Sequence, residues 1–251
     1  MFTNERIVEE KIGPYYDNPD YISHTDDQNG LFSKVYQTLR QVNLRRKLSY
    51  VADFTTTGRV LDYGCGTGQF LEALQLANHE ASGVEINPSA REKAARFGAV
   101  SEDISGVGGD LDVITMWHVM EHVYNLHGLV QEFKNRLKKG GALIIAVPNP
   151  ESPDAAHYGE HWAAWDVPIH AHHFTKKSMQ SFLSAHDFKL HDIIPMDMDA
   201  YYISLLSEQY KDGASKKSLK HWLSAVNQGF KSNSKAGKEN TSSLIYRFIL
   251  E

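Results

Sequence analysis

The hydrophobic pattern of the chain alternates between two kinds of segment. Short apolar runs predict buried strands, and longer stretches with apolar residues three or four positions apart predict helices. The predicted strands cover residues 60–63, 81–86, 99–101, 111–117, 142–147, 189–194 and 244–250. Because strands and helices alternate along the chain, we expect an α/β fold with a mostly parallel sheet and helices on both faces.

Helical spacing recurs between these strands. The predicted helices cover residues 31–48, 70–76, a segment opened by Pro88, and residues 129–138, 175–186, 201–210 and 219–230. Lys139, Gly140 and Gly141 are expected to end the helix over residues 129–138. Residues 232–243 are polar and predict a loop.

The chain divides into an expected N-terminal helical arm or lid, residues 1–55, and one α/β domain, residues 56–251, with helices inserted at about 199–231. The arm carries an aromatic cluster of Tyr15, Tyr16 and Tyr21 near His24. This cluster is consistent with a lid over a substrate and equally with an anchor that holds the arm to the core.

Composition and charge exclude several classes of protein. The 251 residues are 41% hydrophobic and 23% charged, as in ordinary globular proteins, and the net charge of -5 gives no general attraction to nucleic acid or anionic membranes. Cys65 is the only cysteine, so no internal disulfide forms and a reducing compartment is indicated. The N-terminus lacks the apolar core of a signal peptide, and no apolar run is long enough to cross a membrane. We expect a soluble cytoplasmic protein.

Lysines are frequent in the C-terminal part of the chain. They are Lys211, Lys216, Lys217, Lys220, Lys231, Lys235 and Lys238. No aromatic-basic motif for nucleic acid accompanies them, so we interpret them as a solvated face.

The segment RVLDYGCGTGQF, residues 59–70, places three glycines between a strand and a helix. Such a turn lets a ligand lie against the main chain at the N-terminal end of the helix, which is typical of a nucleotide pocket. The spacing is G-x-G-x-G, and Gln69 occupies the position of the third glycine in a dinucleotide fingerprint. The alternative is a tight turn without a ligand.

Glu85 ends the second predicted strand, about twenty residues after the glycine turn. An acidic residue at this spacing accepts hydrogen bonds from ribose hydroxyls in nucleotide-binding folds. The alternative is a glutamate that faces solvent at a strand end. Asn87 and Pro88 then suit the cap and the first position of the next helix.

Glu102, Asp103 and Ile104 follow the third strand and fit an adenine slot. The Asp103 carboxylate can accept a hydrogen bond from an exocyclic amine while Ile104 packs on the ring. Acidic loop residues are common, so this signal is weaker than that of Glu85.

Four motifs stand in the order and spacing of the class I S-adenosylmethionine (SAM)-dependent methyltransferases, which the chain resembles over about residues 59–188. They are DYGCGTG, GVEIN, DVITMWHVMEHV and LKKGGALIIAVPN. The run W-x-x-x-D-x-P-x-H-x-x-H-F at 162–174 resembles the branch that includes the ubiquinone-biosynthesis O-methyltransferases. The resemblance implies a Rossmann-like, doubly wound seven-stranded sheet with an antiparallel last strand. It implies methyl transfer to an oxygen or carbon atom of a small-molecule acceptor, with S-adenosylhomocysteine as the product.

The resemblance also implies which residues bind the cofactor. Asp62 and the glycines would hold the methionine part of SAM, Glu85 the ribose, and Asp103 with Ile104 the adenine. Trp117 and His118 would lie beside the cofactor. The full expected set is Asp62, Gly64, Cys65, Gly66, Gly68, Phe70, Glu85, Ile86, Asn87, Asp103, Ile104, Trp117 and His118.

The segment VPIHAHHF supplies the candidate catalytic histidines. A hydroxyl acceptor benefits from a general base, and histidine suits neutral pH. His170 is the leading candidate, and His173 and His118 are further candidates. Each has a structural alternative: His170 and His173 can be hydrogen-bonded scaffold, and His172 can face solvent. Trp162 and Trp165 are expected to offer flat apolar surfaces nearby.

His118, Glu121 and His122 fall at spacings that share one face of a helix. Two histidines and a carboxylate suit a divalent metal, and some ubiquinone-type relatives are thought to use a metal here. His118 stands where those relatives carry glutamate, so we expect no required metal.

Two other functions are compatible with parts of the pattern. The first is an NAD-dependent oxidoreductase, which the early third glycine disfavours. The second is a non-catalytic SAM-binding protein, which the intact segment at 162–174 disfavours. The expected partner is a small-molecule acceptor, with no nucleic acid and no membrane, and the chain is expected to be a monomer or homodimer.

Overall fold

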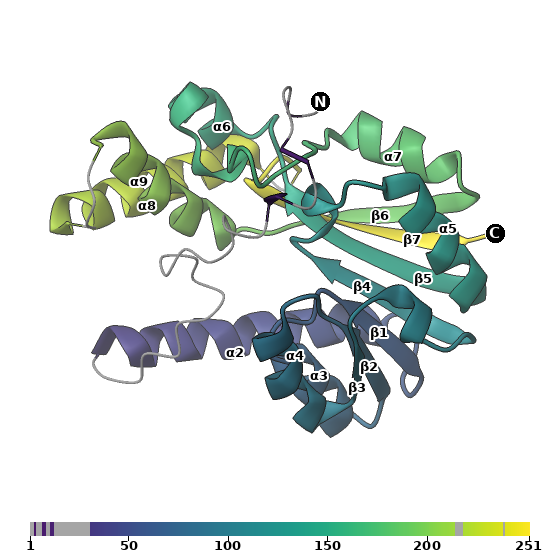
Figure 1. The fold of residues 1–251 in the computed structure, drawn as a ribbon. Coiled ribbons are helices and arrows are strands. Elements are labelled where there is room, and N and C mark those ends of the chain that lie inside the picture. Colours follow the sequence, from purple (N-terminus) through teal and green to yellow (C-terminus); the bar gives the residue numbers. More distant parts are fainter. Residues whose placement is uncertain (1–2, 4–6, 9–10, 13–30, 214–217, 238) are drawn as a thin grey trace. The chain divides into compact units, whose positions relative to one another are not determined.

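The computed structural model describes residues 3, 7–8, 11–12, 31–213, 218–237 and 239–251 (Figure 1). The proposed lid residues Tyr15, Tyr16, Tyr21 and His24 lie outside the described residues. No described helix is both long and apolar enough to cross a membrane.

Seven strands form one sheet in the order β3-β2-β1-β4-β5-β7-β6, with β7 antiparallel. The strands are β1 Arg59–Tyr63, β2 Glu80–Val84, β3 Ala99–Ser101, β4 Leu111–Trp117, β5 Leu137–Pro148, β6 Phe188–Pro195 and β7 Ser243–Leu250. Strands β3, β2, β1 and β4 pair in parallel. The sheet confirms the expected Rossmann-like fold of class I methyltransferases.

The helices fall where the apolar spacing predicts them, with one addition. They are α2 Leu31–Ala52, α3 Gln69–Leu76, α4 Pro88–Ala94, α5 Leu126–Arg136, α6 Pro153–Tyr158, α7 Lys176–Ser184, α8 Asp199–Lys211 and α9 Leu219–Ala236. Helix α6 was not predicted, because its few residues are too short a window for helical periodicity. The predicted Asn87 cap is confirmed, since Asn87 accepts the Ala90 N–H at 3.0 Å. Thr175 caps α7 and forms a capping box with Ser178.

Several predicted boundaries differ by a few residues, and two differ most. Helix α5 ends at Arg136 rather than at the glycines, and β5 begins at Leu137, because Lys138 forms an ion pair of 2.6 Å with Asp112 on the neighbouring strand β4. The predicted loop at 232–243 begins as helix, since α9 continues to Ala236. Ser232 is polar but fully buried, and its hydroxyl donates to Asp154 Oδ1 at 2.8 Å.

The described chain forms two compact units. Of the described residues, the glycine-turn unit comprises 31–116, 127–144 and 249–251, and the histidine unit comprises 3, 7–8, 11–12, 117–126, 145–213, 218–237 and 239–248. The buried core of the glycine-turn unit is aliphatic and includes Leu61, Leu71, Leu74, Val113 and Ile114. In the histidine unit, Trp162 packs with Ala155, Tyr158, Ala164 and Ile203.

Candidate functional site

The turn at residues 64–68, here called the glycine turn, connects β1 to α3. Gly64, Gly66 and Gly68 have φ angles of 79°, 55° and 85°, a region that a side chain disfavours by about 1–2 kcal/mol per residue. The Gly64 and Cys65 N–H groups donate to Val84 O at 2.8 and 3.0 Å, which fixes the turn beside the end of β2.

The glycines of the turn serve two different purposes. A Cβ at Gly68 would lie 2.7 Å from Ala94 Cα, so this glycine is required by the close approach of α4. A Cβ at Gly66 would meet no atom within 4 Å. The backbone at Gly66 therefore borders open space, which a ligand can occupy directly against the main chain.

Glu85 connects the glycine turn to the start of α4. Its Oε2 accepts the Gly66 N–H and its Oε1 accepts the Asn87 N–H, each at 2.8 Å. The side chain is half-buried and is therefore not a glutamate that simply faces solvent. Each carboxylate oxygen can accept more than one hydrogen bond, so both can still accept from a vicinal diol.

Asp62 is a buried carboxylate just before the turn. It is 2% exposed and accepts a hydrogen bond of 2.7 Å from Thr115 Oγ1 on β4. Burial raises the pKa of Asp62 to about 6, and the charge of Lys47 and the Thr115 hydrogen bond oppose this rise. A buried carboxylate with a raised pKa is stabilised by a bound cation such as an ammonium group.

The expected adenine side combines an anchored carboxylate with apolar side chains. Asp103 Oδ1 accepts from Ser105 N at 2.8 Å and from Ser105 Oγ at 2.5 Å, and these bonds lower the Asp103 pKa. Ile86 is 78% exposed and Ile104 is half-buried. An exposed isoleucine next to Glu85 is a surface that an aromatic ring can cover.

Cys65 and Phe70 are directed into the packed interior. Cys65 is 8% exposed and Phe70 is 4% exposed. Burial raises the pKa of the Cys65 thiol, with further increases from Asp62 and Glu85, so the thiol is neutral. Any contact that Cys65 makes with a cofactor is expected to come from its backbone.

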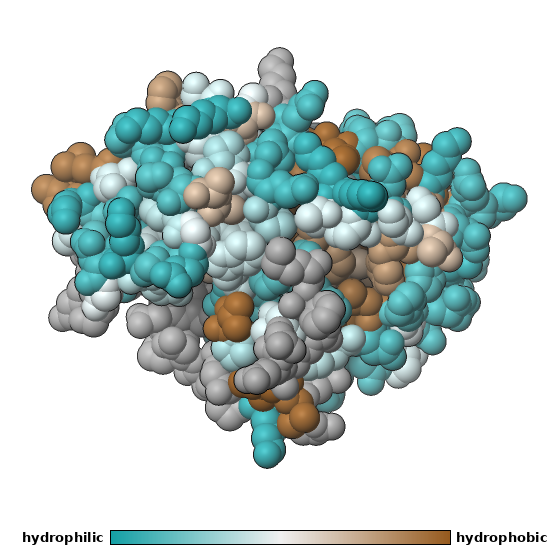
Figure 2. Space-filling view, turned by 90° about the horizontal axis from the view of Figure 1, so that it is seen from above, coloured by the Kyte–Doolittle hydropathy of each residue, from teal (hydrophilic) through white to brown (hydrophobic). Residues whose placement is uncertain are grey.

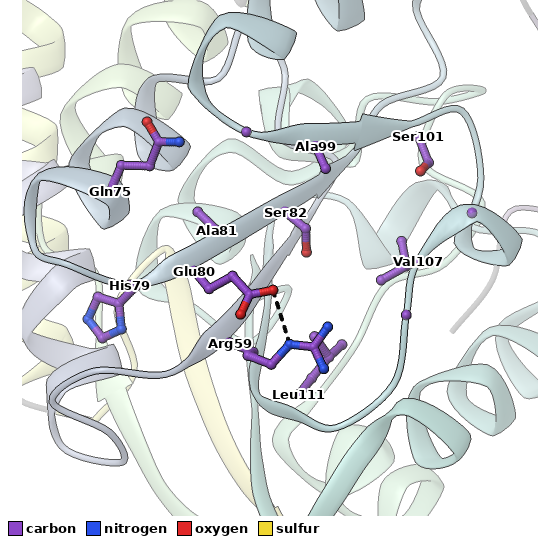
Figure 3. A pocket seen from close by; sticks show the side chains of 13 residues that line it. Arg59, Gln75, His79, Glu80, Ala81, Ser82, Ala99, Ser101, Val107 and Leu111 are labelled. Carbon is purple, nitrogen blue, oxygen red and sulfur yellow. Dashed lines mark hydrogen bonds and ion pairs between the residues drawn. The ribbon is translucent and has the colours of Figure 1, made fainter.

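A separate cavity lies at the amino ends of the strands β1, β2 and β4, away from the glycine turn, which follows the carboxyl end of β1 (Figure 3). Its volume is about 410 Å³, and Arg59, Glu80 and Leu111, which begin β1, β2 and β4, line it. Arg59 Nε and Glu80 Oε1 form an ion pair of 3.2 Å in this cavity, marked in Figure 3. Because ligands of α/β sheets bind at the carboxyl ends of strands, this cavity is not the cofactor site.

In the histidine unit, His118 directly follows β4 with a left-handed φ of 57°. Its Nε2 lies 3.1 Å from Asp199 Oδ2 on α8, and its Nδ1 lies 3.5 Å from Glu121 Oε1. Burial alone would lower the pKa of His118, but Asp199 and Glu121 outweigh it and raise the pKa to about 10. His118 is therefore an imidazolium at neutral pH, which can donate hydrogen bonds but cannot accept a proton.

Glu121 lies at the centre of this unit and is 1% exposed. Burial would raise its pKa, but His118, His122 and His170 lower it to about 2. Its backbone carbonyl accepts from Ala171 N at 2.8 Å and from His172 N at 3.1 Å. Glu121 thus fixes the segment 170–173 through its backbone and supplies a buried negative charge through its side chain.

The Nδ1 atom of His170 lies 3.0 Å from the carbonyl oxygen of Ala164. A carbonyl only accepts, so Nδ1 carries the proton and Nε2 carries the lone pair. Burial lowers the pKa of His170 to about 3, although the Glu121 charge opposes this. His170 is neutral at neutral pH, and its Nε2 lies 3.8 Å from Asp166 Oδ2.

Thr3, near the start of the sequence, holds the segment 170–173 in place. Its N–H donates to Ala171 O at 3.1 Å, and its hydroxyl donates to His170 O at 2.5 Å. His173 is 8% exposed, its ring centroid lies 5.0 Å from that of Trp165, and burial lowers its pKa.

The expected apolar surface at Trp162 is a prediction that the structure corrects. Trp162 is 1% exposed, and its indole N–H donates to the buried carboxylate of Asp154 at 2.8 Å. The residue is part of the core, because a tryptophan whose indole N–H finds a buried partner can be buried completely. Trp165 is half-buried and packs at a ring distance of 5.0 Å from Trp162.

Glu121, His122 and His170 bring possible metal-ligating atoms within 4.8 Å of one another. His118, which the sequence grouped with Glu121 and His122, is not part of this set, and its two ring nitrogens face Asp199 and Glu121. The Glu121 charge already interacts with the His118 imidazolium, so a cation lies beside the cluster. These atoms could hold a metal ion, and the expectation that no metal is required stays a prediction.

Sequence reasoning missed Thr115, Asp199, Asp166 and Thr3. Thr115 had a usable signal, since the register of β1 with β4 places it beside Asp62. Asp199 and Thr3 had none, because each reaches the site from a distant part of the chain. Trp117, expected beside the cofactor, is half-buried at the end of β4.

Comparison with known proteins agrees with this geometry. The family model for the methyltransferase domain matches residues 36–193. The ubiquinone biosynthesis O-methyltransferase of Xanthomonas campestris pv. campestris (strain B100) is 27% identical over 171 residues, covering 60% of this chain and 71% of that protein. The demethylmenaquinone methyltransferase of Tropheryma whipplei (strain Twist) is 27% identical over 143 residues, covering 49% of this chain and 59% of that protein.

Solved structures share the fold at low sequence identity. Magnesium protoporphyrin IX methyltransferase from Synechocystis PCC 6803, determined with bound S-adenosylhomocysteine, has a TM-score of 0.59 at 14% identity, covering 95% of this chain and 97% of that chain. A SAM-dependent methyltransferase from Archaeoglobus fulgidus has a TM-score of 0.57 at 18% identity, covering 84% of this chain and 94% of that chain. With the family match and the glycine turn, this fold shows that the chain belongs to the methyltransferase domain family and is a SAM-dependent methyltransferase.

Proposed function

We propose that the enzyme methylates an oxygen atom, or alternatively a carbon atom, of a small-molecule acceptor, with His170 as general base. The observation that carries this proposal is the bonding of His170. Its Nδ1 is committed to Ala164 O, so Nε2 presents a lone pair within a unit that holds the buried Glu121 carboxylate. The name of the Xanthomonas relative, an O-methyltransferase, supports an oxygen acceptor.

The cofactor residues are assigned from the glycine-turn unit. The ammonium group of SAM fits the buried Asp62 carboxylate, and the backbone at Gly66 leaves room for the methionine part. Glu85 can accept from the ribose hydroxyls, and Ile86 and Ile104 offer apolar contacts for adenine. When bound, SAM supplies an electrophilic methyl group on a sulfonium. The chain then has to position the acceptor and exclude water, which can contribute about 7–11 kcal/mol in the best cases.

The charges of the histidine unit suggest which kind of acceptor is used. A base with a pKa of about 3 cannot deprotonate a hydroxyl in a separate step, so His170 would accept the proton only as the methyl group is transferred, which demands least with a more acidic hydroxyl. Phenolic hydroxyls, with a pKa of about 10, are more acidic than aliphatic alcohols. The Glu121 carboxylate stabilises the imidazolium that forms on His170. We therefore favour an aromatic hydroxyl as the acceptor.

His173 is assigned to positioning rather than proton transfer. Its Nε2 lies 3.5 Å from the Thr3 hydroxyl, and its ring packs on Trp165. Both contacts hold the segment that carries His170.

The proposal is tested in two steps. Calorimetric titration with SAM, S-adenosylhomocysteine and NAD should show binding of the first two only; NAD binding would instead support an oxidoreductase. Radiolabelled SAM is then assayed with phenols, catechols and aliphatic alcohols. Absence of turnover with every acceptor class, despite SAM binding, would favour the non-catalytic SAM-binding protein.

The role of His170 as general base is tested with the variant His170→Gln, assayed with an acceptor that the wild-type enzyme methylates. Loss of a general base should reduce kcat by roughly 10²–10⁴-fold while the SAM dissociation constant stays the same. His157→Gln is the matched control, because His157 is an exposed histidine of the same unit. Unchanged kcat in His170→Gln would leave His170 with a structural role.

A further inference from the structure

Helix α9 presents its large apolar side chains to solvent. Leu219 is 75% exposed, Leu223 67%, Phe230 65%, Val226 55% and Trp222 42%. These five residues, here called the outer stripe, recur three or four positions apart and therefore lie on one side of the helix. Figure 2 shows hydrophobic residues on the surface at the left end of the molecule, the end at which Figure 1 shows α8 and α9.

The buried side of α9, next to the outer stripe, is small, polar and tightly packed. Its buried residues are His221, Ala225, Gly229 and Ser232. A Cβ at Gly229 would lie 2.7 Å from Tyr201 Cδ1 on α8, and Ser232 is bonded to the buried Asp154. The helix cannot rotate to bury its outer stripe without breaking these contacts, so the exposure of the stripe is fixed by the fold.

The charges of α9 are all positive. The helix contains Lys220, Lys231 and Lys235 and no aspartate or glutamate. At 3.6 residues per turn, the outer stripe spans roughly 100° and the lysines follow on one flank, roughly 60–120° further round. Lysines in this position can extend their amino groups to the level of lipid phosphates while the apolar side chains insert below them.

We propose that α9 is an interfacial helix that binds the surface of an anionic lipid membrane through the outer stripe. Apolar aromatic and aliphatic side chains on one face, with lysines on its flank, are the features of helices that lie in the membrane interface. Lys220 also forms an exposed ion pair of 3.4 Å with Asp212, so Lys231 and Lys235 carry most of the expected attraction to lipid phosphates. The helix would lie on the membrane and would not cross it. The net charge of -5 gave no reason to expect this association, because it averages over the whole chain and hides a local cationic face.

Charge and size favour a lipid surface over a second copy of the chain. A stable protein interface needs about 800 Å² per partner, and one stripe of five partly exposed side chains provides too little. Two copies joined through α9 would also bring Lys231 and Lys235 of each copy close together, and α9 contains no acidic residue that could pair with them. A lipid surface needs no minimum area of this kind, and its phosphates complement the lysines.

The full-length protein is tested by co-sedimentation with two kinds of vesicle. One contains equal amounts of phosphatidylglycerol and phosphatidylcholine, and the other contains phosphatidylcholine alone. We expect binding to the first, weaker binding to the second, and a decrease at high salt. Lys220→Gln, Lys231→Gln and Lys235→Gln combined should weaken binding to the anionic vesicles at least tenfold, since each lysine contributes roughly fivefold.

The apolar contribution is tested by Leu223→Ser combined with Phe230→Ser. Both side chains are exposed, so folding is preserved, and binding should fall by roughly a hundredfold. The matched control is Leu76→Ser, a leucine on α3 that is 80% exposed and should leave binding unchanged. The proposal is overturned if the wild-type protein binds neither vesicle, or if the double variant binds as the wild type does. It is equally overturned if the protein is a dimer that the double variant dissociates.

Discussion

The Nε2 atom of His118 lies 3.1 Å from Asp199 Oδ2, so an ion pair joins the end of β4 to the start of α8. Glu121 approaches the other ring nitrogen of His118 at 3.5 Å. A histidine between two carboxylates keeps its proton, and this determines which histidine of the unit is cationic and which is neutral.

Replacing Asp199 should let the His118 imidazolium lose its proton at a lower pH than in the wild type. In Asp199→Asn the pKa of His118, about 10 in the wild type, should fall because one of the two flanking negative charges is gone. Histidine NMR titration measures the change. Asp197→Asn, two positions away and exposed, is the control. An unaltered pKa in Asp199→Asn would show that Glu121 alone holds the proton.

The same pair makes stability depend on pH. The folded-state pKa of His118 lies above the unfolded value of about 6.5, so its stabilisation is fully present below pH 6.5 and is lost as pH rises through about 10. Urea unfolding at a series of pH values should show this decline in the wild type. The decline should be smaller in Asp199→Asn; an equal decline in both proteins would assign it to other groups.

SAM affinity should weaken in acid because of Asp62. Its pKa of about 6 in the free protein means that the carboxylate is mostly ionised at pH 7 and mostly protonated at pH 5. The dissociation constant for SAM should therefore rise roughly tenfold between pH 7 and pH 5. Asp62→Asn should bind SAM weakly at both pH values. A pH-independent affinity in the wild type would mean that Asp62 does not bind the ammonium group.

Substitutions of two glycines in the glycine turn should affect protein stability and SAM binding separately. Gly68→Ala should destabilise the protein by roughly 2–5 kcal/mol, because it combines a left-handed φ with a Cβ 2.7 Å from Ala94 Cα. Gly66→Ala should cost only about 1 kcal/mol, since its Cβ meets no protein atom, yet it should weaken SAM binding. Denaturant unfolding and calorimetry distinguish the two. Normal SAM binding by Gly66→Ala would place the ligand elsewhere.

Removal of metal should leave activity unchanged. Glu121 is paired with His118, and His170 has only Nε2 available, so the cluster with His122 is not expected to need a cation. Activity with and without a chelator, together with elemental analysis of the purified protein, provides the measurement. Activity lost in chelator and restored by a single ion would contradict this expectation, and His122→Ala would then identify the site.

The sheet and the glycine turn could be predicted from sequence because their determinants are local. Alternating strands and helices, the G-x-G-x-G spacing and the Asn87 cap are each encoded within a few residues. The expected site residues Gly66 and Glu85 follow from the same local pattern, and a hydrogen bond joins them, while their contact with the cofactor stays a prediction.

The histidine unit was predicted less well because its properties arise from tertiary contacts. His118 was a candidate base, yet Asp199 makes it a cation. Trp162 was expected to form a surface, yet its bond to Asp154 draws it into the core. Polar Ser232 suggested a loop, but burial against the same aspartate keeps it in α9. In each case a partner distant in sequence overrides the local preference.

The buried thiol of Cys65 has a practical consequence for labelling. The only cysteine of the chain is 8% exposed, and its raised pKa keeps it protonated, so maleimide reagents should leave it unmodified. A cysteine introduced on the surface can therefore be labelled selectively without first removing a native one. An environment-sensitive fluorophore at position 223, within the outer stripe, would then report whether α9 enters lipid while the active site turns over.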